Sequence, residues 1–343
     1  MNFNRFFAVF KARNIEFFRD KSALGWNLFF PVLLLVGFSF IFSGDGRPAY
    51  KIGLLSQQDQ SQSSAQTILT QLRFIDFIDY KDVDLAKAKL SRHSLDLLVD
   101  YSTQRYWVNE ESSKSYLVEK IFLGQQLSQQ PGFTRLESSG ESIRYVDWVL
   151  PGILGMNMMF SCLFGVGYVI VRYRKNSVLK RLKATPLSAF EFVSAQLLSR
   201  LFIVMFMSTV VYSGCNLFFD FFMLGSYIDL FIIGALGAFC LISLGLLVAS
   251  RSKSEELIGG LLNLTSWPMM MLSGVWFSLE GAPDGLKVLA NFMPLTHMVA
   301  GARAVITEGA SLNDISFHIS MLMLMSSVFL LLGAYLFSWN TER

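Results

Sequence analysis

The side chains best suited to binding a partner are six Lys and Arg residues within a stretch of twelve. They lie in RYRKNSVLKRLK, residues 172–183, which contains no acidic residue. A short helix there would present apolar side chains to a cleft in a partner and cationic side chains to its rim. The alternative is that the six charges only fix membrane topology. The apolar set is Val178, Leu179 and Leu182, and the cationic set is Lys180, Arg181 and Lys183.

Catalytic and metal chemistry find little support in the residue types. The chain contains no Gly-Lys dipeptide, so it has no GxxxxGK[ST] phosphate loop. Cys162, Cys215 and Cys240 fall in apolar runs, and CxxC or Cys/His metal spacing is absent. His297 stands apart from other possible ligands, and a lone His is more often a hydrogen-bonded structural residue. We therefore expect no catalytic residue, no metal and no cofactor in this chain.

Polar and sulfur-bearing side chains inside apolar runs are candidates for contact with a bound molecule. Arg200 lies near the start of one run, where it either reaches the lipid headgroups or pairs with an acid such as Glu191. The clustered Met residues favour an adaptable apolar lining over thioether metal ligands. For a substrate-facing surface we select Asn157, Met159, Asn263, Trp267 and Met270.

Membrane-length helices must position these residues. Hydrophobic residues make up 52% of the 343-residue chain and charged residues 16%, with a mean hydropathy of +0.44. About 20 apolar residues are needed to cross a bilayer as a helix. Six runs meet that length: 24–42, 149–171, 193–219, 230–250, 257–277 and 315–338. The sequence thus predicts a polytopic α-helical membrane protein with six transmembrane helices.

Small residues favour close contact in two of these runs, the second and the fifth. Both also hold the polar and Met-rich positions selected above, so we expect them to line a route at a dimer interface. The glycines concerned are Gly152, Gly155, Gly259 and Gly260.

Residues 1–23 predict an amphipathic helix that lies in the membrane interface before the first span, 24–42. Phe residues recur there at helical spacing, with Lys and Arg between them. The alternative is a simple helical extension of the first span.

The segment 45–147 has the composition of a folded domain. Between Gly44 and Asp147 there are 12 basic and 14 acidic residues, and about 100 residues is too long for a structureless connection. The patterns predict strands at 50–56, 74–80, 95–101 and 104–110, with helices at 82–92 and 114–127. We expect a small extracytoplasmic α/β domain that serves as a binding or packing module.

The stretch 283–306 predicts a re-entrant helical hairpin between the fifth and sixth spans. Pro294 splits its apolar part into two pieces, each too short to cross alone. A full crossing would place 307–314, with two acids and no Lys or Arg, in the cytoplasm.

Charge asymmetry predicts the orientation. The N-terminal segment carries five Lys and Arg, residues 172–183 carry six, and residues 251–256 carry two. These segments share the cytoplasmic side by the positive-inside rule, as do both termini. Residues 148–343 then hold the second to sixth spans, with a coupling loop at 172–192.

Four segments carry a family resemblance: EFFRDKSALGWNLFFPVLLLVGFSF, VDWVLPGILGMNMM, VLKRLKATPLSAFEFVSAQ and MMMLSGVWFSLEGAPDGLKVLANFMPLTHMVAGARAVITEG. Together with the order of the features above, they resemble the permease subunit of ABC-2 type ABC exporters, in the branch with a large extracytoplasmic domain after the first helix. The resemblance covers nearly the whole chain. One departure is that the family often has a Glu-Arg-Glu cluster before the coupling segment, where this chain has Arg172, Tyr173, Arg174 and Lys175.

The resemblance implies two ATPase subunits that bind ATP and Mg²⁺, and a second permease copy or paralogue as a dimer partner. It also implies a bacterial cytoplasmic (inner) membrane location, contact with lipids rather than nucleic acid, and export of an amphiphilic drug, lipid, antibiotic or glycan-like cargo. The alternatives are a membrane-anchored sensor or scaffold without transport, and a secondary transporter. The secondary transporter is disfavoured because internal repeats and buried charge pairs are missing from the pattern.

Overall fold

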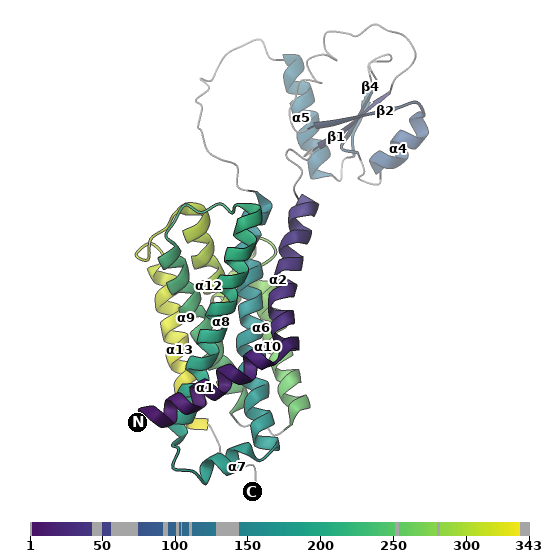
Figure 1. Cartoon of the computed structure of the whole chain (residues 1–343). Helices are drawn as coiled ribbons and strands as arrows, with labels where there is room; N and C mark the ends of the chain where they lie inside the picture. Colours follow the sequence, from purple (N-terminus) through teal and green to yellow (C-terminus); the bar gives the residue numbers. More distant parts are fainter. Residues whose placement is uncertain are drawn as a thin grey trace. The chain divides into compact units, whose positions relative to one another are not determined.

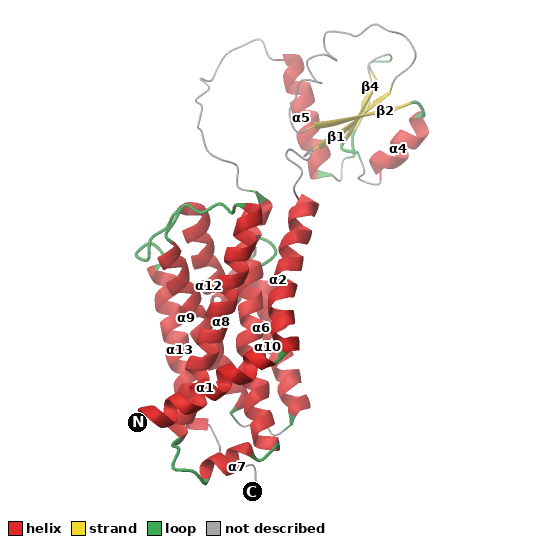
Figure 2. Ribbon diagram, viewed as in Figure 1, coloured by secondary structure: helices red, strands yellow, loops and turns green. Residues whose placement is uncertain are grey.

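The computed structural model resolves the chain into helices, strands and short connections (Figures 1 and 2). It divides into two compact units, Met1–Ser43 with Ser142–Arg343, and Gly44–Glu141. We call them the helical unit and the sheet unit. The residues that the structure describes are 2–42, 50–55, 75–91, 95–100, 103, 105–109, 112–127, 144–250, 254–279 and 282–336.

The helical unit is built from long helices joined by short connections. Its elements are α1 (Phe3–Arg19), α2 (Lys21–Phe42), α6 (Tyr145–Lys175), α7 (Val178–Lys183), α8 (Ala189–Phe219), α9 (Tyr227–Ala249), α10 (Glu255–Leu272), α11 (Asp284–Asn291), α12 (Pro294–Arg303), a π-helical turn (Ala304–Glu308) and α13 (Ser316–Leu336).

Asp20 separates α1 from α2. Its backbone is extended, and its N–H donates to the Phe17 carbonyl at 3.1 Å, which ends α1. Its carboxylate accepts the N–H of Ala23 at 3.0 Å, which caps the start of α2. The chain changes direction here, so that α1 lies crosswise to α2 and α8 (Figure 1). The second helix therefore begins at Lys21, three residues before the predicted start of the first span.

Five helices in the described part of the chain are long and apolar enough to cross a membrane: Lys21–Ile41, Tyr145–Lys175, Ala189–Phe219, Tyr227–Ala249 and Ser316–Leu336. The predicted helical membrane class is thereby confirmed. The fifth predicted span, 257–277, corresponds to α10, which is not among the five helices named above. Its 18 residues include Glu255, Glu256 and Asn263, which lower its hydropathy.

Helix α6 is the central helix of the unit, and about two thirds of the residues in its most apolar stretch are buried. A Cβ added at Gly152 would lie 2.5 Å from the Val275 carbonyl oxygen, and one at Gly155 would lie 2.8 Å from a Val299 methyl. These glycines therefore bring together segments of one chain, rather than two copies of it.

The segment 283–306 forms two short helices, α11 and α12, that turn at Phe292–Met293. Pro294 occupies the first turn of α12, where its missing N–H costs nothing. Helix α12 is almost wholly buried and packs on α6, α9 and α13, whereas α11 is exposed apart from Ala290. The enclosure of α12 suits an interrupted helix inside a membrane protein.

The sheet unit contains β1 (Tyr50–Leu55), β2 (Ile75–Tyr80), α4 (Val83–Ser91), β3 (Leu97–Asp100), β4 (Arg105–Trp107) and α5 (Ser113–Leu127). Its strand order is β2-β1-β3-β4, with β1 parallel to both neighbours and β4 antiparallel to β3. All four predicted strands and both predicted helices are present.

Both faces of the sheet carry a small apolar core. Ile52 and Leu97 pack with Phe122 of α5, while Leu98 packs with Leu90 of α4. The predicted boundary at 147 needs correction, because the helix that follows the unit already begins at Tyr145.

Candidate functional site

The basic segment 172–183 forms the end of α6, a sharp turn and helix α7. Ser177 adopts a left-handed backbone with φ of 56°, and its N–H donates to the Arg174 carbonyl at 3.2 Å. The N–H of Asn176 likewise donates to the Arg172 carbonyl at 2.9 Å. This turn separates α7 from the axis of α6.

Helix α7 turns its apolar and charged side chains to different surroundings. Leu179 is 1% exposed, so it packs into the helical unit and does not face a partner, contrary to the expected docking set. Val178 and Leu182 are half-buried, and Lys180 and Arg181 are exposed. The side chain of Lys183 lies outside the described residues.

Two cations of the segment form contacts within the helical unit. Arg174 is buried, and its guanidinium donates to the carbonyls of Ala249 at 3.3 Å and Ser250 at 3.0 Å, which end α9. A cation at a helix C-terminus is favourable because those carbonyls lack helical partners. Lys175 forms an ion pair of 3.7 Å with Glu255 at the start of α10.

Helix α1 is fastened to the end of α6 by a three-residue network. Arg13 donates to Glu16 at 2.6 Å and to the Tyr173 hydroxyl at 3.0 Å. The Tyr173 hydroxyl donates in turn to Glu16 at 2.6 Å. The network therefore joins the end of α6 to α1.

A second set of bonds joins α1 to the start of α8. Glu191 and Ser188 form a reciprocal capping box, with bonds of 3.0 and 3.2 Å. The other Glu191 oxygen accepts the Asn2 N–H at 2.6 Å, and Arg5 donates to the Pro186 carbonyl. Residues 172–192 therefore contact α1 near both ends of the segment.

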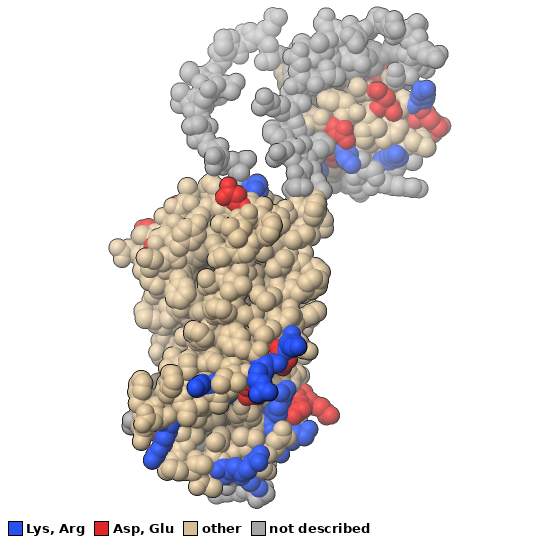
Figure 3. Space-filling model, in the orientation of Figure 1, with Lys and Arg blue, Asp and Glu red and all other residues tan. Residues whose placement is uncertain are grey.

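Charged side chains gather at the end of the helical unit that carries α1 and α7. Figure 3 shows Lys and Arg there, and a band without charged side chains across the middle of the displayed face. This distribution is what a membrane-spanning unit with one basic end requires.

The five selected substrate-facing residues lie in two environments. Met159 and Met270 are 0% and 5% exposed and belong to the apolar core. Asn157 is also buried, and its amide donates to the Asn27 carbonyl at 3.4 Å. Asn263 and Trp267 are exposed on one side of α10.

Arg200 is 8% exposed and donates to the hydroxyl of Ser161 at 2.7 Å and to its carbonyl. Its guanidinium fills the space beside Gly165 and lies over the Phe17 ring. The proposed pairing with Glu191 is wrong, because that carboxylate is engaged at the helix cap. Burial also excludes an extended side chain in the headgroups.

His297 has a partner that the sequence interpretation missed. Its Nε2 lies 2.8 Å from the Asn291 carbonyl and its Nδ1 lies 3.0 Å from Nδ1 of His318. The pair joins α12 to α13, which supports the structural role expected for His297. A polar residue near the start of the apolar run 315–338 was the available signal for His318.

Arg303 is a further residue that the sequence interpretation missed. It donates to the carbonyls of Trp148 at 3.2 Å and Gly274 at 2.8 Å, and stacks 3.9 Å above the Trp148 ring. One side chain therefore links α12, α6 and the turn after α10. In the described part of the chain, no group of three His, Cys, Asp or Glu residues is placed to hold a metal ion.

The fold therefore defines a helical membrane protein with a small α/β unit and a basic end. The family model described as ABC-2 family transporter protein matches residues 21–335. This span is most of the chain, and the chain belongs to the ABC-2 transporter family.

Curated relatives carry permease names. The chain is 27% identical over 163 residues to the inner membrane transport permease YhhJ of Escherichia coli. The matched region covers 45% of this chain and 41% of that protein. It is 24% identical over 169 residues to the linearmycin resistance permease protein LnrN of Bacillus subtilis. That match covers 47% of this chain and 42% of the relative. The match thus spans less than half the length of each relative.

Proposed function

We propose that this protein is the permease subunit of an ATP-driven ABC-2 exporter in the bacterial inner membrane. The observation that carries the proposal is an exposed pair of cations on a short helix at the basic end of an ABC-2 family membrane unit. This chain would form the route, and separate ATPase subunits would bind ATP and Mg²⁺.

The proposed topology has six crossings, with α10 as the fifth and α11–α12 as a re-entrant hairpin. Both ends of the chain are then cytoplasmic, and the sheet unit is on the opposite side. A reporter active only in the cytoplasm should be active when fused after Arg343 and silent when inserted near Gln60. A silent reporter after Arg343 would show an odd number of crossings, either because α10 does not cross or because α11–α12 crosses fully.

Docking of the ATPase subunits is assigned to the outward face of α7. Lys180 and Arg181 are exposed there, and Arg174 is buried against the end of α9. Interface cations steer an acidic partner and fix its register. ATP-driven movement of the partner would reach α1 and α8 through the bonds at Glu191 and Tyr173.

The test is a double charge reversal, K180E/R181E, in tagged permease co-expressed and purified with a candidate P-loop ATPase subunit. K114E/K120E, in the sheet unit, reverses the same number of charges and is the matched control. We expect only K180E/R181E to lose the ATPase while both proteins still insert into the membrane. Wild-type recovery of the ATPase with K180E/R181E would refute docking at α7.

A dimer with a route at its interface remains part of the proposal, now centred on α10. Asn263 and Trp267 are exposed on this helix, and a Cβ at Gly260 would meet no atom within 4 Å. The apolar and aromatic surface suits an amphiphilic cargo. A cysteine at 263, in a background without the three native cysteines, should react with a polar thiol reagent in an ATP-dependent manner, whereas one at buried Met159 should not react.

A further inference from the structure

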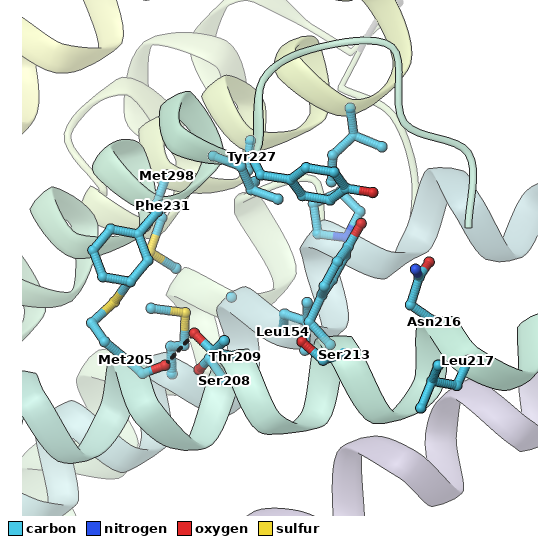
Figure 4. A pocket seen from close by; sticks show the side chains of 18 residues that line it. Leu154, Met205, Ser208, Thr209, Ser213, Asn216, Leu217, Tyr227, Phe231 and Met298 are labelled. Carbon is cyan, nitrogen blue, oxygen red and sulfur yellow. Dashed lines mark hydrogen bonds between the residues drawn. The ribbon is translucent and has the colours of Figure 1, made fainter. Parts of the chain in front are cut away.

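A cavity of about 560 Å³ lies between α6, α8, α9 and α12 of the helical unit (Figure 4). Met158 and Met298, at its floor, are 6% and 2% exposed. Leu217, Tyr227 and Phe231, at its rim, are more than half exposed. The cavity therefore opens on the surface of the unit between α8 and α9. Its volume falls within the range of about 300–1,000 Å³ that is common for small-molecule sites.

One wall of the cavity is a polar row on α8. Its members recur at i, i+1, i+4, i+5 and i+8, which places them on a single face of the helix. Apart from Cys215 they are the polar side chains of residues 201–219, and every one of them lines the cavity. They are Ser208, Thr209, Tyr212, Ser213 and Asn216.

Two side chains of this row form hydrogen bonds with the backbone of the protein. The Thr209 hydroxyl donates to the Met205 carbonyl at 2.8 Å (Figure 4), and the Asn216 oxygen accepts the Phe221 N–H at 3.0 Å. The Tyr212 hydroxyl is buried and interacts with the side chain of Tyr227, and the two rings meet edge to face at 6.2 Å between centroids. A ligand hydroxyl can join this pair, because a hydroxyl group both donates and accepts hydrogen bonds.

Charge and position limit the chemistry of that ligand. The lining contains no Lys, Arg, Asp or Glu, so a charged head would find no counter-ion. Both helices at the mouth are membrane-spanning by length and composition, which places the opening against lipid chains. The polar members Tyr212, Ser213 and Asn216 lie near the end of α8, and Tyr227 lies at the start of α9, so the polar end of the cavity lies toward the membrane surface.

We propose that this cavity binds one neutral amphiphile taken from the membrane. Its alkyl chain occupies the Met- and Phe-lined interior, and its hydroxyl-bearing head bonds to Tyr212 and Asn216. The depth of the floor favours a flexible chain over a helix face of a second copy. The cavity lies in the half of α8 away from the basic segment, so the source is the outer leaflet; this leaflet assignment alone rests on the topology proposed above.

The test uses an analogue of 1-monooleoylglycerol with a diazirine in its acyl chain, and the purified full chain in phosphatidylcholine nanodiscs. Gly234→Leu fills the cavity, because a Cβ there would meet only methionine methyls at 3.8 and 4.0 Å. Gly214→Leu is the matched control, since a Cβ there meets no atom within 4 Å. Tyr212→Phe removes one head contact and no volume from the fold.

We expect labelling on α8 and α9 that falls at least tenfold with Gly234→Leu and is unchanged with Gly214→Leu. Tyr212→Phe should lower labelling about three- to tenfold, the effect of one hydrogen bond. Equal labelling of Gly234→Leu and wild type, cross-links between two copies, or equal labelling by a photoreactive phosphatidate would each overturn the proposal. The assay needs neither ATP nor transport, so its failure is distinct from failure of the exporter function.

Discussion

Replacing Arg174 by Ala should destabilise the helical unit, whereas replacing Arg172 by Ala should not. Arg174 is 8% exposed and donates to two carbonyls at the end of α9, while Arg172 is exposed two residues away. Charge-assisted hydrogen bonds contribute about 1.5–3 kcal/mol each, so at the low end Arg174→Ala costs about 3 kcal/mol. For a body of this size that corresponds to about 6–12 °C in Tm.

The assay is thermal unfolding of the two purified variants in one detergent, followed by tryptophan fluorescence. Both substitutions remove one positive charge from the same segment, so their effects on membrane topology are matched. Arg174→Lys keeps the charge without the forked donor geometry and should fall between wild type and Arg174→Ala. Equal Tm values for Arg172→Ala and Arg174→Ala would refute the assignment of Arg174 to the α9 end.

Three further outcomes are expected. Gly165→Leu should prevent recovery of monodisperse protein in size-exclusion chromatography, because the guanidinium of Arg200 occupies the space beside Gly165; normal recovery would refute this packing. Arg303→Met should lower stability by about 3 kcal/mol through loss of two hydrogen bonds and the stacking on Trp148, and a Tm within 2 °C of wild type would contradict it. Two hydrogen bonds from Ser311 hold the pKa of Asp314 below its usual range, so its carboxylate supports the 311–314 turn at neutral pH. That support is lost as pH falls through the lowered pKa, so Asp314→Asn should speed amide exchange at 311–316 at neutral pH, and exchange that matches wild type there would contradict it.

The helices and strands could be predicted because their signals are local. Apolar runs of membrane length mark α2, α6, α8, α9 and α13, and short alternating runs mark the strands. Element boundaries were less accurate, since they depend on individual hydrogen bonds. The cap at Asp20 moves the start of α2 to Lys21, and no local pattern predicts the start of α6 at Tyr145.

The sequence did not predict which basic residues are buried against other helices and which are exposed. Arg172, Arg174 and Lys175 look alike in a basic run, but their roles depend on which helix end lies beside them. Leu179 was expected to face a partner because apolar side chains in a basic loop suit an interface, and the tertiary packing of α7 buries it. The partners of Arg200 and His297 lie 39 and 21 residues away, beyond any periodic signal.

The central claim, docking of an ATPase on α7, is tested most directly by site-specific photo-crosslinking in cells. A photoreactive phenylalanine at Arg181 should capture the P-loop ATPase, because Arg181 is exposed on the basic helix. The same group at Tyr116, which is 58% exposed in the sheet unit, should capture none. Capture from position 116, or from neither position, would contradict the account.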